Sequence, residues 1–481
     1  MIEQINTPSM PESKDYDFGM IGLGVMGSNL LLNMADHGFK VVGFDTNAEK
    51  TNLLEASANK GTTVSGVNSL EEMISILQPP RKVMMLVPAG KPVDDVINSL
   101  LPLMQPGDII IDGGNSHYTD TLRRIRFLED KNLHFLGIGI SGGEQGARLG
   151  PSIMPGGDEK AYLTVAPLLE AVAAKVEGKP CVAFLGNGAA GHYVKMVHNG
   201  IEYAIMQLIS ECYDLMHHGM LMTNNELHNT FQQWDEGEMK SFLLEITAEV
   251  FAKKDDKTGD YLVDKILDKA GAKGTGKWTS QEGLDLPLPI PTIDMAVMMR
   301  NLSSLREERL LAAELYSTVS NKIDIEKEIL LADLHDALYL ATLVSYAQGL
   351  AMLATASREL NMNIPIKQVV NVWKGGCIIR SELLKVFEAA YTTNGELKNL
   401  LLDPSIASIV NNKIGGLQHI VIQAASENYP LAGMMASLNY INAYCRNSLP
   451  TNLIQAQRDL FGAHTYQRID EDGSFHTEWD K

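Results

Sequence analysis

Short apolar runs alternate with helix-length amphipathic segments through the first part of the chain. Five runs are apolar or β-branched, are bounded by turn residues and have the length of a buried strand: 18–22, 40–45, 82–88, 108–112 and 134–140. Helix-length segments such as 28–37 and 94–103 lie between them. This alternation is typical of a parallel sheet covered by helices on both faces. A helical stretch at 159–176 and an apolar run at 180–185 are expected to complete the layer.

After Gly191 the pattern changes to long helical periodicities, the clearest at 194–217, 294–317 and 329–359. Glycines at 187–191 mark a boundary between the two patterns. We therefore expect an α/β protein with three parts. These are a doubly wound sheet domain at 1–188, a large all-helical domain at 189–447, and a C-terminal tail at 448–481. The tail is rich in polar and aromatic residues, so we expect it to need another surface to pack on.

Composition narrows the class of protein. The 481 residues are 45% apolar and 21% charged, which excludes a disordered or collagen-like chain. No run approaches the ~20 uninterrupted apolar residues of a membrane span, and the N-terminus lacks the apolar core of a secretory signal. Four scattered cysteines argue against disulfides or a thiolate zinc site, so we expect a cytoplasmic protein without a metal. A net charge of −19 disfavours nucleic acid as a partner.

A glycine-rich loop, Gly22-Leu23-Gly24-Val25-Met26-Gly27, directly follows the first expected strand. The first glycine suits a tight turn, the second lets the backbone approach a pyrophosphate, and the third lets the helix pack on the strand. The second expected strand ends at Asp45, 18 residues beyond Gly27. This is close to the spacing at which a Rossmann-like fold places the acid that binds the coenzyme ribose. The alternative is a purely structural turn.

Asp45 bears on the choice between NAD and NADP. A carboxylate there can accept hydrogen bonds from the ribose hydroxyls of NAD, and it repels the 2′-phosphate of NADP. No arginine follows it, and the nearest cation, Lys50, lies beside Glu49. We therefore expect NAD, unless Asp45 is an ordinary solvated acid at a strand end.

A polar stripe follows the helix expected after Gly191, and its members are Lys195, His198, Asn199 and Glu202. The i, i+3, i+4, i+7 spacing puts them on one helix face, and apolar neighbours would hold that face at a cleft. A lysine acts as a base near neutral pH only if its pKa falls well below ~10.4. The alternative is the solvated face of a surface helix.

Three loops are further candidates for the same cleft. Two of them, 112–116 and 141–144, follow expected strands at the edge where open α/β sheets bind ligands. The third, 273–278, offers two lysines and a threonine among glycines, which suits a phosphate. Each of the three could instead be a plain turn.

Together these segments resemble the 6-phosphogluconate dehydrogenases, the decarboxylating enzymes of the pentose phosphate pathway within the β-hydroxyacid dehydrogenase superfamily. The resemblance runs from Phe18 almost to the C-terminus. The matching segments are 109–116, 141–144, 152–157, 191–203, 273–278, 373–380 and 453–466. The resemblance implies metal-free oxidative decarboxylation of 6-phosphogluconate to ribulose 5-phosphate, with reduction of a nicotinamide coenzyme.

The resemblance also implies a role for each matched residue. Lys195 is expected to take the proton from the 3-hydroxyl, and Glu202 is expected to protonate carbon 1 of the enediol. The residues expected around the sugar acid are Asn115, Ser141, Gly142, Gly143, His198, Asn199 and Glu202. Those expected around its phosphate are Tyr203, Lys273, Thr275 and Arg300, with Arg458 and His464 from the tail of the neighbouring subunit. The implied assembly is a homodimer that exchanges tails.

For the coenzyme, the resemblance implies contacts from the glycine loop and three other loops. The residues are Gly22, Leu23, Gly24, Val25, Met26, Gly27, Asp45, Thr46, Asn47, Val87, Pro88, Ala89 and Asn115. Members that use NADP usually carry Asn-Arg-Thr or Asn-Arg-Ser where this chain has Asp45-Thr46-Asn47, and Ala in place of Gly24. Both departures favour NAD, with NADP as the less favoured alternative. Most members also carry Lys in place of Pro88, near the nicotinamide.

Two other functions stay open on the sequence alone. A related dehydrogenase could act on an unphosphorylated acid without decarboxylation, but such chains are typically much shorter and lack the tail and its phosphate-binding residues. A catalytically silent nucleotide-binding or scaffold protein is disfavoured because both Lys195 and Glu202 are retained.

Overall fold

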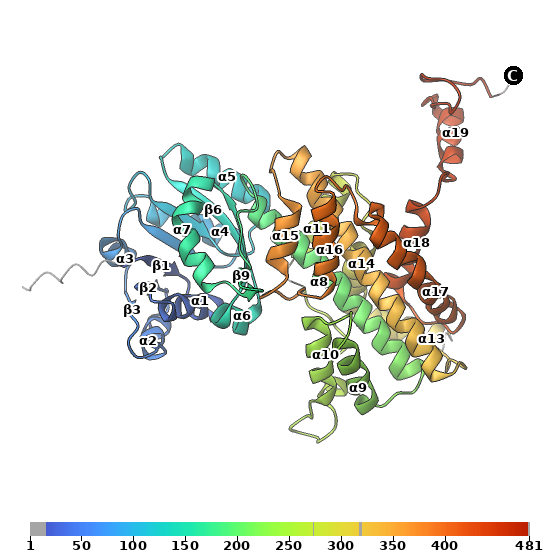
Figure 1. The fold of residues 1–481 in the computed structure, drawn as a ribbon, viewed down its shortest axis with the longest axis horizontal. Coiled ribbons are helices and arrows are strands. Elements are labelled where there is room, and N and C mark those ends of the chain that lie inside the picture. Colours follow the sequence, from blue (N-terminus) through green and yellow to red (C-terminus); the bar gives the residue numbers. More distant parts are fainter. Residues whose placement is uncertain (1–15, 273, 317–319, 480–481) are drawn as a thin grey trace, which may run out of the picture.

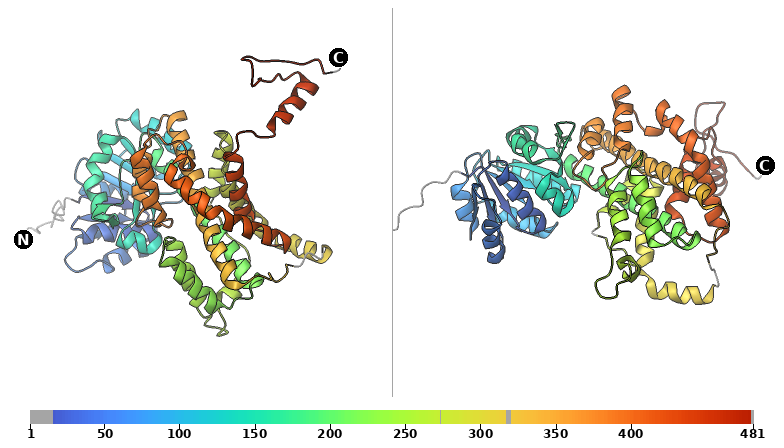
Figure 2. Two further views of the ribbon diagram at one scale, coloured as in Figure 1. Left: turned by 45° about the vertical axis from the view of Figure 1, so that its right-hand side comes forward. Right: turned by 60° about the horizontal axis from the view of Figure 1, so that its bottom comes forward.

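The computed structural model describes residues 16–272, 274–316 and 320–479. A sheet domain and a helical domain lie side by side, and the last helix, α19 (Thr451–Gly462), projects away from both (Figures 1 and 2).

Seven strands form the sheet, in the order β3-β2-β1-β4-β5-β6-β7. They are β1 (Phe18–Ile21), β2 (Val41–Phe44), β3 (Val64–Gly66), β4 (Lys82–Met85), β5 (Ile109–Asp112), β6 (His134–Ser141) and β7 (Ser152–Gly157). The first six are parallel and β7 is antiparallel to β6. The predicted Rossmann-like doubly wound sheet is therefore confirmed, with β3 and β7 as additions. Strand β7 was not predicted, because it contains Pro155 and two glycines in place of the β-branched and apolar residues typical of a strand.

Helices cover both faces of this sheet. One face packs against α1 (Val25–Asp36), α2 (Ala48–Ala56), α6 (Gly143–Leu149) and α7 (Glu159–Val172). The other packs against α3 (Leu70–Ile76), α4 (Lys91–Leu100) and α5 (Tyr118–Glu129). Successive strand residues serve opposite faces, as Val83 and Met84 do, because the side chains of a strand alternate. The run predicted at 180–185 is not a full strand. Its first residue, Pro180, ends a short hairpin of β8 (Lys175–Val176) with β9 (Lys179–Pro180), and Val182 forms one bridge to Ile153.

The helical domain is built around two long helices, α8 (Ala190–Asp214) and α14 (Lys327–Glu359), which pack on each other. The surrounding helices are α9 (Asn224–Asp235), α10 (Phe242–Ala252), α11 (Thr275–Asp285), α12 (Pro291–Ser304), α13 (Arg306–Leu315), α15 (Ile366–Trp373), α16 (Leu383–Thr393), α17 (Pro404–Ser426) and α18 (Ala432–Tyr444). The single helix predicted over 294–317 is two helices, α12 and α13, which meet at Leu305. A π-helical turn (Leu215–Gly219) continues α8.

Helix α14 is long and apolar enough to span a membrane by length and composition. However, 83% of its most apolar window is buried inside the protein, where it packs on α8 and α17. It is therefore a core helix, and its uniform hydrophobicity reflects burial on all sides.

Helix α8 lies directly on strands β6 and β7, at glycines. A Cβ added to Gly139 in β6 would lie 2.4 Å from the Cβ of Lys195. One added to Gly191 in α8 would lie 2.2 Å from the carbonyl oxygen of Gly137. The missing side chains allow the backbones to approach closely, which brings the polar face of α8 to the edge of the sheet.

We expect Gly139→Ala to lower the free energy of unfolding by about 1–3 kcal/mol, because the added methyl group overlaps the stem of Lys195. Urea unfolding measures this change. The matched control is Gly415→Ala in α17, an exposed site where an added Cβ meets nothing within 4 Å. This control should be neutral or stabilising by up to about 1 kcal/mol, since alanine favours helix. Equal effects at both positions would contradict the close-packing argument.

Candidate active site

The glycine loop lies where the strand order reverses, between β1 and β4. Gly22 has a φ of +92°, and a Cβ there would lie 2.5 Å from the carbonyl oxygen of Leu86. A Cβ on Gly27 would lie 1.9 Å from the carbonyl oxygen of Gly22. No side chain caps the N-terminus of α1 at Gly24. The loop therefore offers backbone N–H groups at a helix N-terminus, as a dinucleotide pyrophosphate requires.

Asp45 is bound into this loop rather than presented as a free carboxylate. Its Oδ2 accepts a hydrogen bond from the N–H of Leu23 (2.8 Å) and its Oδ1 from the N–H of Asn47 (2.9 Å). The Lys50 ammonium lies 3.3 Å from Oδ2. Partial burial raises the pKa of the Asp45 carboxyl, but the hydrogen bonds and Lys50 outweigh burial and the net shift is downward.

The polar stripe of α8 is buried rather than solvated. His198 is fully buried, Lys195 is 7% exposed, and the side chain of Glu202 is 21% exposed. The Nζ of Lys195 lies 3.5 Å from His198 Nδ1, and Glu202 Oε2 lies 3.8 Å from the same nitrogen. The structure therefore brings an amine, an imidazole and a carboxyl group together on one helix face.

Burial shifts the proton affinities of all three groups. It lowers the pKa of the Lys195 ammonium, while the Glu202 carboxylate opposes this shift. It raises the pKa of the Glu202 carboxyl, against the opposing charges of Lys195 and Arg300. Burial and the charge of Lys195 push the pKa of His198 well below its usual value, so this imidazole is neutral. An amine that is easier to deprotonate thus lies near a carboxyl group that is easier to protonate.

A chain of hydrogen bonds crosses the site. The neutral His198 donates from Nδ1 to Asn199 Oδ1 (3.0 Å), so its Nε2 accepts from the Ser141 hydroxyl (3.2 Å). The side-chain amide of Asn199 donates to Thr275 Oγ1 at the start of α11 (3.0 Å). The chain joins the end of β6 to the helical domain and fixes the direction of these polar groups.

Arg300 lies flat over the ring of Tyr203, with its Cζ 3.6 Å from the ring centroid, and it donates to the carbonyl oxygen of Gly271 (2.9 Å). A Cβ on Gly276 would lie 2.5 Å from the same ring. The segment predicted as a loop is therefore the first turn of α11 from Thr275 onward, and this turn and Arg300 flank Tyr203. Lys273 lies outside the described residues.

Other predicted residues lie at the rim or elsewhere. Asn115 is exposed after β5, and Val87, Pro88 and Ala89 form the connection from β4 to α4. Gly142 and Gly143 begin α6 with φ angles of +132° and +64°. Arg458 and His464 lie in the projecting tail, so this chain does not bring them to its own α8 site (Figure 1).

A segment of the helical domain that was assigned no role from the sequence closes the site. The Trp373 ring meets His198 edge-on, with centroids 5.8 Å apart, and the N–H of Ile378 points to Ser141 Oγ at 3.5 Å. The only signal in the sequence was the match of 373–380 to the family, which identifies a segment but not its neighbours.

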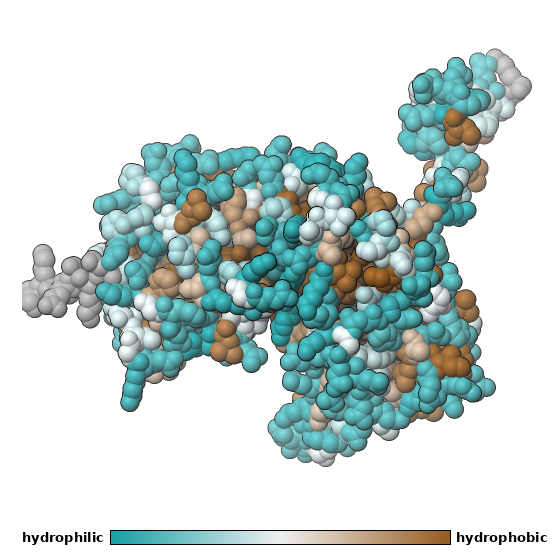
Figure 3. Space-filling model, viewed as in Figure 1, coloured by the Kyte–Doolittle hydropathy of each residue, from teal (hydrophilic) through white to brown (hydrophobic). Residues whose placement is uncertain are grey.

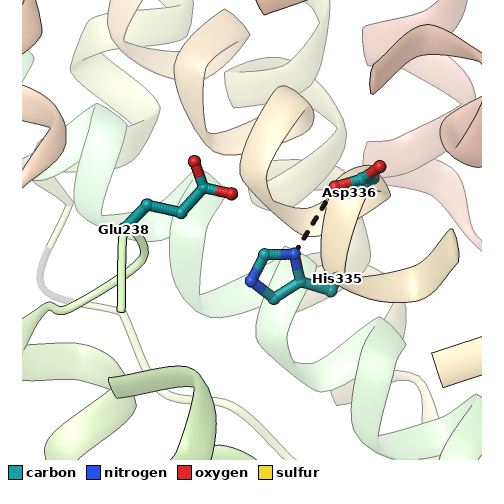
Figure 4. A group of neighbouring side chains, drawn as sticks. All are labelled: Glu238, His335 and Asp336. Atoms are coloured by element: carbon teal, nitrogen blue, oxygen red, sulfur yellow. Dashed lines mark hydrogen bonds and ion pairs between the residues drawn. The ribbon is translucent and has the colours of Figure 1, made fainter. Parts of the chain in front are cut away.

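Within the described part of the chain, Glu238, His335 and Asp336 place potential metal-ligand atoms within 4.8 Å of one another (Figure 4). The ammonium of Lys413 lies 2.7 Å from Glu238 Oε1 and 2.7 Å from Asp336 Oδ1. A lysine therefore already neutralises the two carboxylates, and we interpret the group as an ion-pair network.

A glycine loop at the reversal point of the sheet, together with a buried amine and carboxyl group on the helix packed against β6 and β7, is typical of a nicotinamide-dependent oxidoreductase. Residues 17–186 match the model for the NAD binding domain of 6-phosphogluconate dehydrogenase, and residues 191–479 match that for its C-terminal domain. The chain belongs to the 6-phosphogluconate dehydrogenase family.

Its relatives are similar over nearly their whole length. The NADP(+)-dependent, decarboxylating 6-phosphogluconate dehydrogenase of Bacillus subtilis is 47% identical, over 96% of this chain and 99% of the relative. The decarboxylating enzyme of Synechocystis is 47% identical, over 96% and 97%. The Plasmodium falciparum 6-phosphogluconate dehydrogenase, solved with its cofactor NADP+ and with its substrate 6-phosphogluconate, has a TM-score of 0.93 and 44% identity. The match covers 96% of this chain and all of that structure.

The prediction of NAD as the main coenzyme is wrong. The Bacillus subtilis relative is named NADP(+)-dependent, and the Plasmodium falciparum structure has NADP+ as its cofactor. The physical reason lies in Asp45. The prediction assumed a free carboxylate that repels a phosphate, whereas its oxygens are held by Leu23 and Asn47 and its charge is offset by Lys50.

We expect Lys195→Met to raise the free energy of unfolding at pH 7 by about 1–2 kcal/mol, since it removes a buried charge. Because folding lowers the pKa of Lys195, the destabilisation is present at pH values below the folded-state pKa. This destabilisation disappears as the pH rises from the folded-state pKa toward the unfolded-state value of ~10.4. The increase in the free energy of unfolding caused by Lys195→Met should therefore become smaller over that pH range. Urea unfolding at several pH values measures it, with the exposed Lys60→Met as control. A destabilised Lys195→Met would contradict the burial argument.

Proposed function

We propose that this chain oxidises 6-phosphogluconate at carbon 3 with NADP+, releasing carbon dioxide and ribulose 5-phosphate, with Lys195 as base and Glu202 as acid. The observation that carries the proposal is the buried Lys195–His198–Glu202 group at the carboxyl edge of the coenzyme-binding sheet. The names of the relatives supply the substrate and the coenzyme.

Lys195 begins the reaction as a neutral amine. Burial lowers its pKa, which makes the ammonium easier to deprotonate, and the neutral amine can take the proton of the 3-hydroxyl. A nicotinamide coenzyme held by the glycine loop at residues 22–27 would supply the acceptor for the hydride that leaves carbon 3. The product is a β-keto acid, and its carbon–carbon bond to the carboxylate breaks because the adjacent carbonyl accepts the electron pair. Lys195, now an ammonium, stabilises the negative charge that develops on that oxygen.

Glu202 completes the reaction from two helical turns further along α8. Burial raises its pKa and so favours the form of the carboxyl group that carries a proton. It donates that proton to carbon 1 of the enediol, which gives ribulose 5-phosphate. The neutral His198 and Asn199, held in the chain from Ser141 to Thr275, orient the substrate hydroxyls and carboxylate. We assign Asn115, Gly142 and Gly143 to the same sugar acid, and Tyr203, Lys273, Thr275 and Arg300 to its phosphate.

The loop geometry supports coenzyme binding by residues 22–27, 45–47 and 87–89 together with Asn115. The backbone N–H groups at the start of α1 suit a pyrophosphate, and Gly22 and Gly27 leave no room for side chains. Because Lys50 compensates the charge of Asp45, a 2′-phosphate approaching this end of the site does not meet an unpaired carboxylate.

We further propose a homodimer in which residues 448–481 of one subunit complete the site of the other. Four large apolar side chains on α19 are exposed: Leu453, Ile454, Leu460 and Phe461. Figure 3 shows hydrophobic surface on the projecting tail. Apolar surface on a projecting arm favours a partner that covers it. Arg458 and His464 lie on this arm and would supply positive charge and hydrogen-bond donors to the substrate phosphate. A cytoplasmic location fits the four unpaired cysteines, three of them buried.

Turnover with 6-phosphogluconate tests the proposal directly. We expect nicotinamide reduction, followed at 340 nm, to match carbon dioxide release mole for mole. The kcat/KM should be at least about tenfold higher with NADP+ than with NAD+. Lys195→Met and Glu202→Gln should lower kcat by about 10²–10⁴-fold while the fold is retained. Turnover by Lys195→Met at the wild-type rate, or reduction without carbon dioxide release, would overturn the proposal.

Mixed dimers test the tail exchange. A purified heterodimer of a Lys195→Met chain and an Arg458→Ala chain should regain about half of the wild-type kcat/KM, because exchange gives one intact site per dimer. The matched control pairs Lys195→Met with Glu202→Gln, which leaves a defect in each site whether or not tails are exchanged. If the first heterodimer is no more active than its parents, each tail serves its own chain.

A further inference from the structure

A buried guanidinium links the two loops at the rim of the coenzyme site. Arg124 lies on α5 and is 1% exposed. Its Nη2 donates to the carbonyl oxygen of Gly90 (3.0 Å), and its Nε donates to Asp94 Oδ1 (2.8 Å). Gly90 ends the loop that contains Val87, Pro88 and Ala89, and Asp94 lies in the first turn of α4. The guanidinium therefore fixes the end of the β4–α4 connection.

The other side of the same guanidinium holds the loop that carries Asn115. Its Nη1 donates to Ser116 Oγ (3.1 Å) and lies 3.5 Å from Asp112 Oδ2. The fully buried Asp112 carboxylate in turn accepts hydrogen bonds from the N–H of Gly114 (2.9 Å) and the hydroxyl of Ser116 (2.6 Å). The residues on both sides of Asn115 are thus held by one ion pair, although Asn115 itself is exposed.

The same network reaches the catalytic helix through His192, one turn before Lys195 on α8. His192 is 2% exposed, and its Nε2 donates to the backbone oxygen of Asp112 (3.1 Å). Its Nδ1 lies 2.7 Å from the hydroxyl of Thr121, which is on α5 one turn before Arg124. Burial lowers the pKa of His192, so the ring is neutral and Nδ1 accepts the Thr121 hydrogen bond.

We propose that Arg124 is a positioning residue for hydride transfer, and this inference rests on the function proposed above. Arg124 contacts Gly90 in the β4–α4 connection, and it contacts Asp112 and Ser116 on either side of Asn115. These contacts hold the two loops, which we call the rim loops, in one arrangement relative to α8 and Lys195. A misplacement of the reacting carbons by a fraction of an ångström slows hydride transfer far more than it weakens binding. A lysine cannot replace Arg124, because a single ammonium cannot reach the four acceptors on Gly90, Asp94, Asp112 and Ser116 in the way that the planar guanidinium does.

Arg124→Lys tests the inference, with Arg123→Lys as the matched control. Arg123 is the adjacent residue and also contacts Asp94 (2.9 Å), but its side chain is 56% exposed. We expect Arg124→Lys to lower kcat about 10–100-fold while the KM for 6-phosphogluconate changes less than about threefold. The deuterium isotope effect on kcat, measured with substrate labelled at carbon 3, should rise because hydride transfer becomes rate-limiting. Arg123→Lys should stay within about twofold of wild type.

Ser116→Ala provides a milder second variant in case Arg124→Lys folds poorly. It removes one of the two links between Arg124 and the Asn115 loop, and it should lower kcat about 3–10-fold with the same rise in isotope effect. If both variants lose activity only in proportion to the unfolded fraction, with an unchanged isotope effect, Arg124 is merely structural and the inference fails. Failure of the proposed function is distinguishable, because the wild-type protein would then not reduce NADP+ with 6-phosphogluconate.

Discussion

The close contact between helix α8 and strands β6 and β7 is the constraint on which the site depends. Glycines on both sides remove the side chains that would separate them, so the stem of Lys195 lies against Gly139. This contact carries the polar face of α8 from the helical domain to the carboxyl edge of the sheet. At that edge the glycine loop and the rim loops present backbone groups to a coenzyme. Without the contact, the amine of Lys195 and the coenzyme site would belong to separate domains.

Burial then shifts the pKa values of the side chains on this face of α8. Lys195 and Glu202 have opposite charges, and desolvation shifts both toward their neutral forms, lowering one pKa and raising the other. The two shifts together favour a neutral amine that can accept a proton and a neutral carboxyl that can donate one. His198, buried between them and neutral, contributes hydrogen bonds without adding a charge. The buried charge of Lys195 destabilises the fold, which is a common cost of placing a base in a desolvated site.

The coenzyme prediction failed for a specific physical reason. The identity of Asp45 and its distance from the glycine loop could be obtained from the sequence, and both matched a ribose-binding acid. The contacts of this carboxylate could not be predicted, because they come from two separate segments of the chain. The N–H of Leu23 lies in the glycine loop, whereas Asn47 and Lys50 follow the second strand. A charge that is bound in this way has a different effect on a nearby phosphate from that of a free charge.

The sequence by itself determined the helix-covered parallel sheet, the helical second half and the face of α8 that carries Lys195, His198, Asn199 and Glu202. These follow from local periodicity and from glycines whose spacing is fixed along the chain. It did not reveal β3 and β7, the break at Leu305, or the contacts of Trp373, Ile378 and Arg124. Only the tertiary structure decided these, because each depends on which residues distant in the chain are brought together. Burial, and with it every shifted pKa in the site, arises from that packing and leaves no local pattern in the sequence.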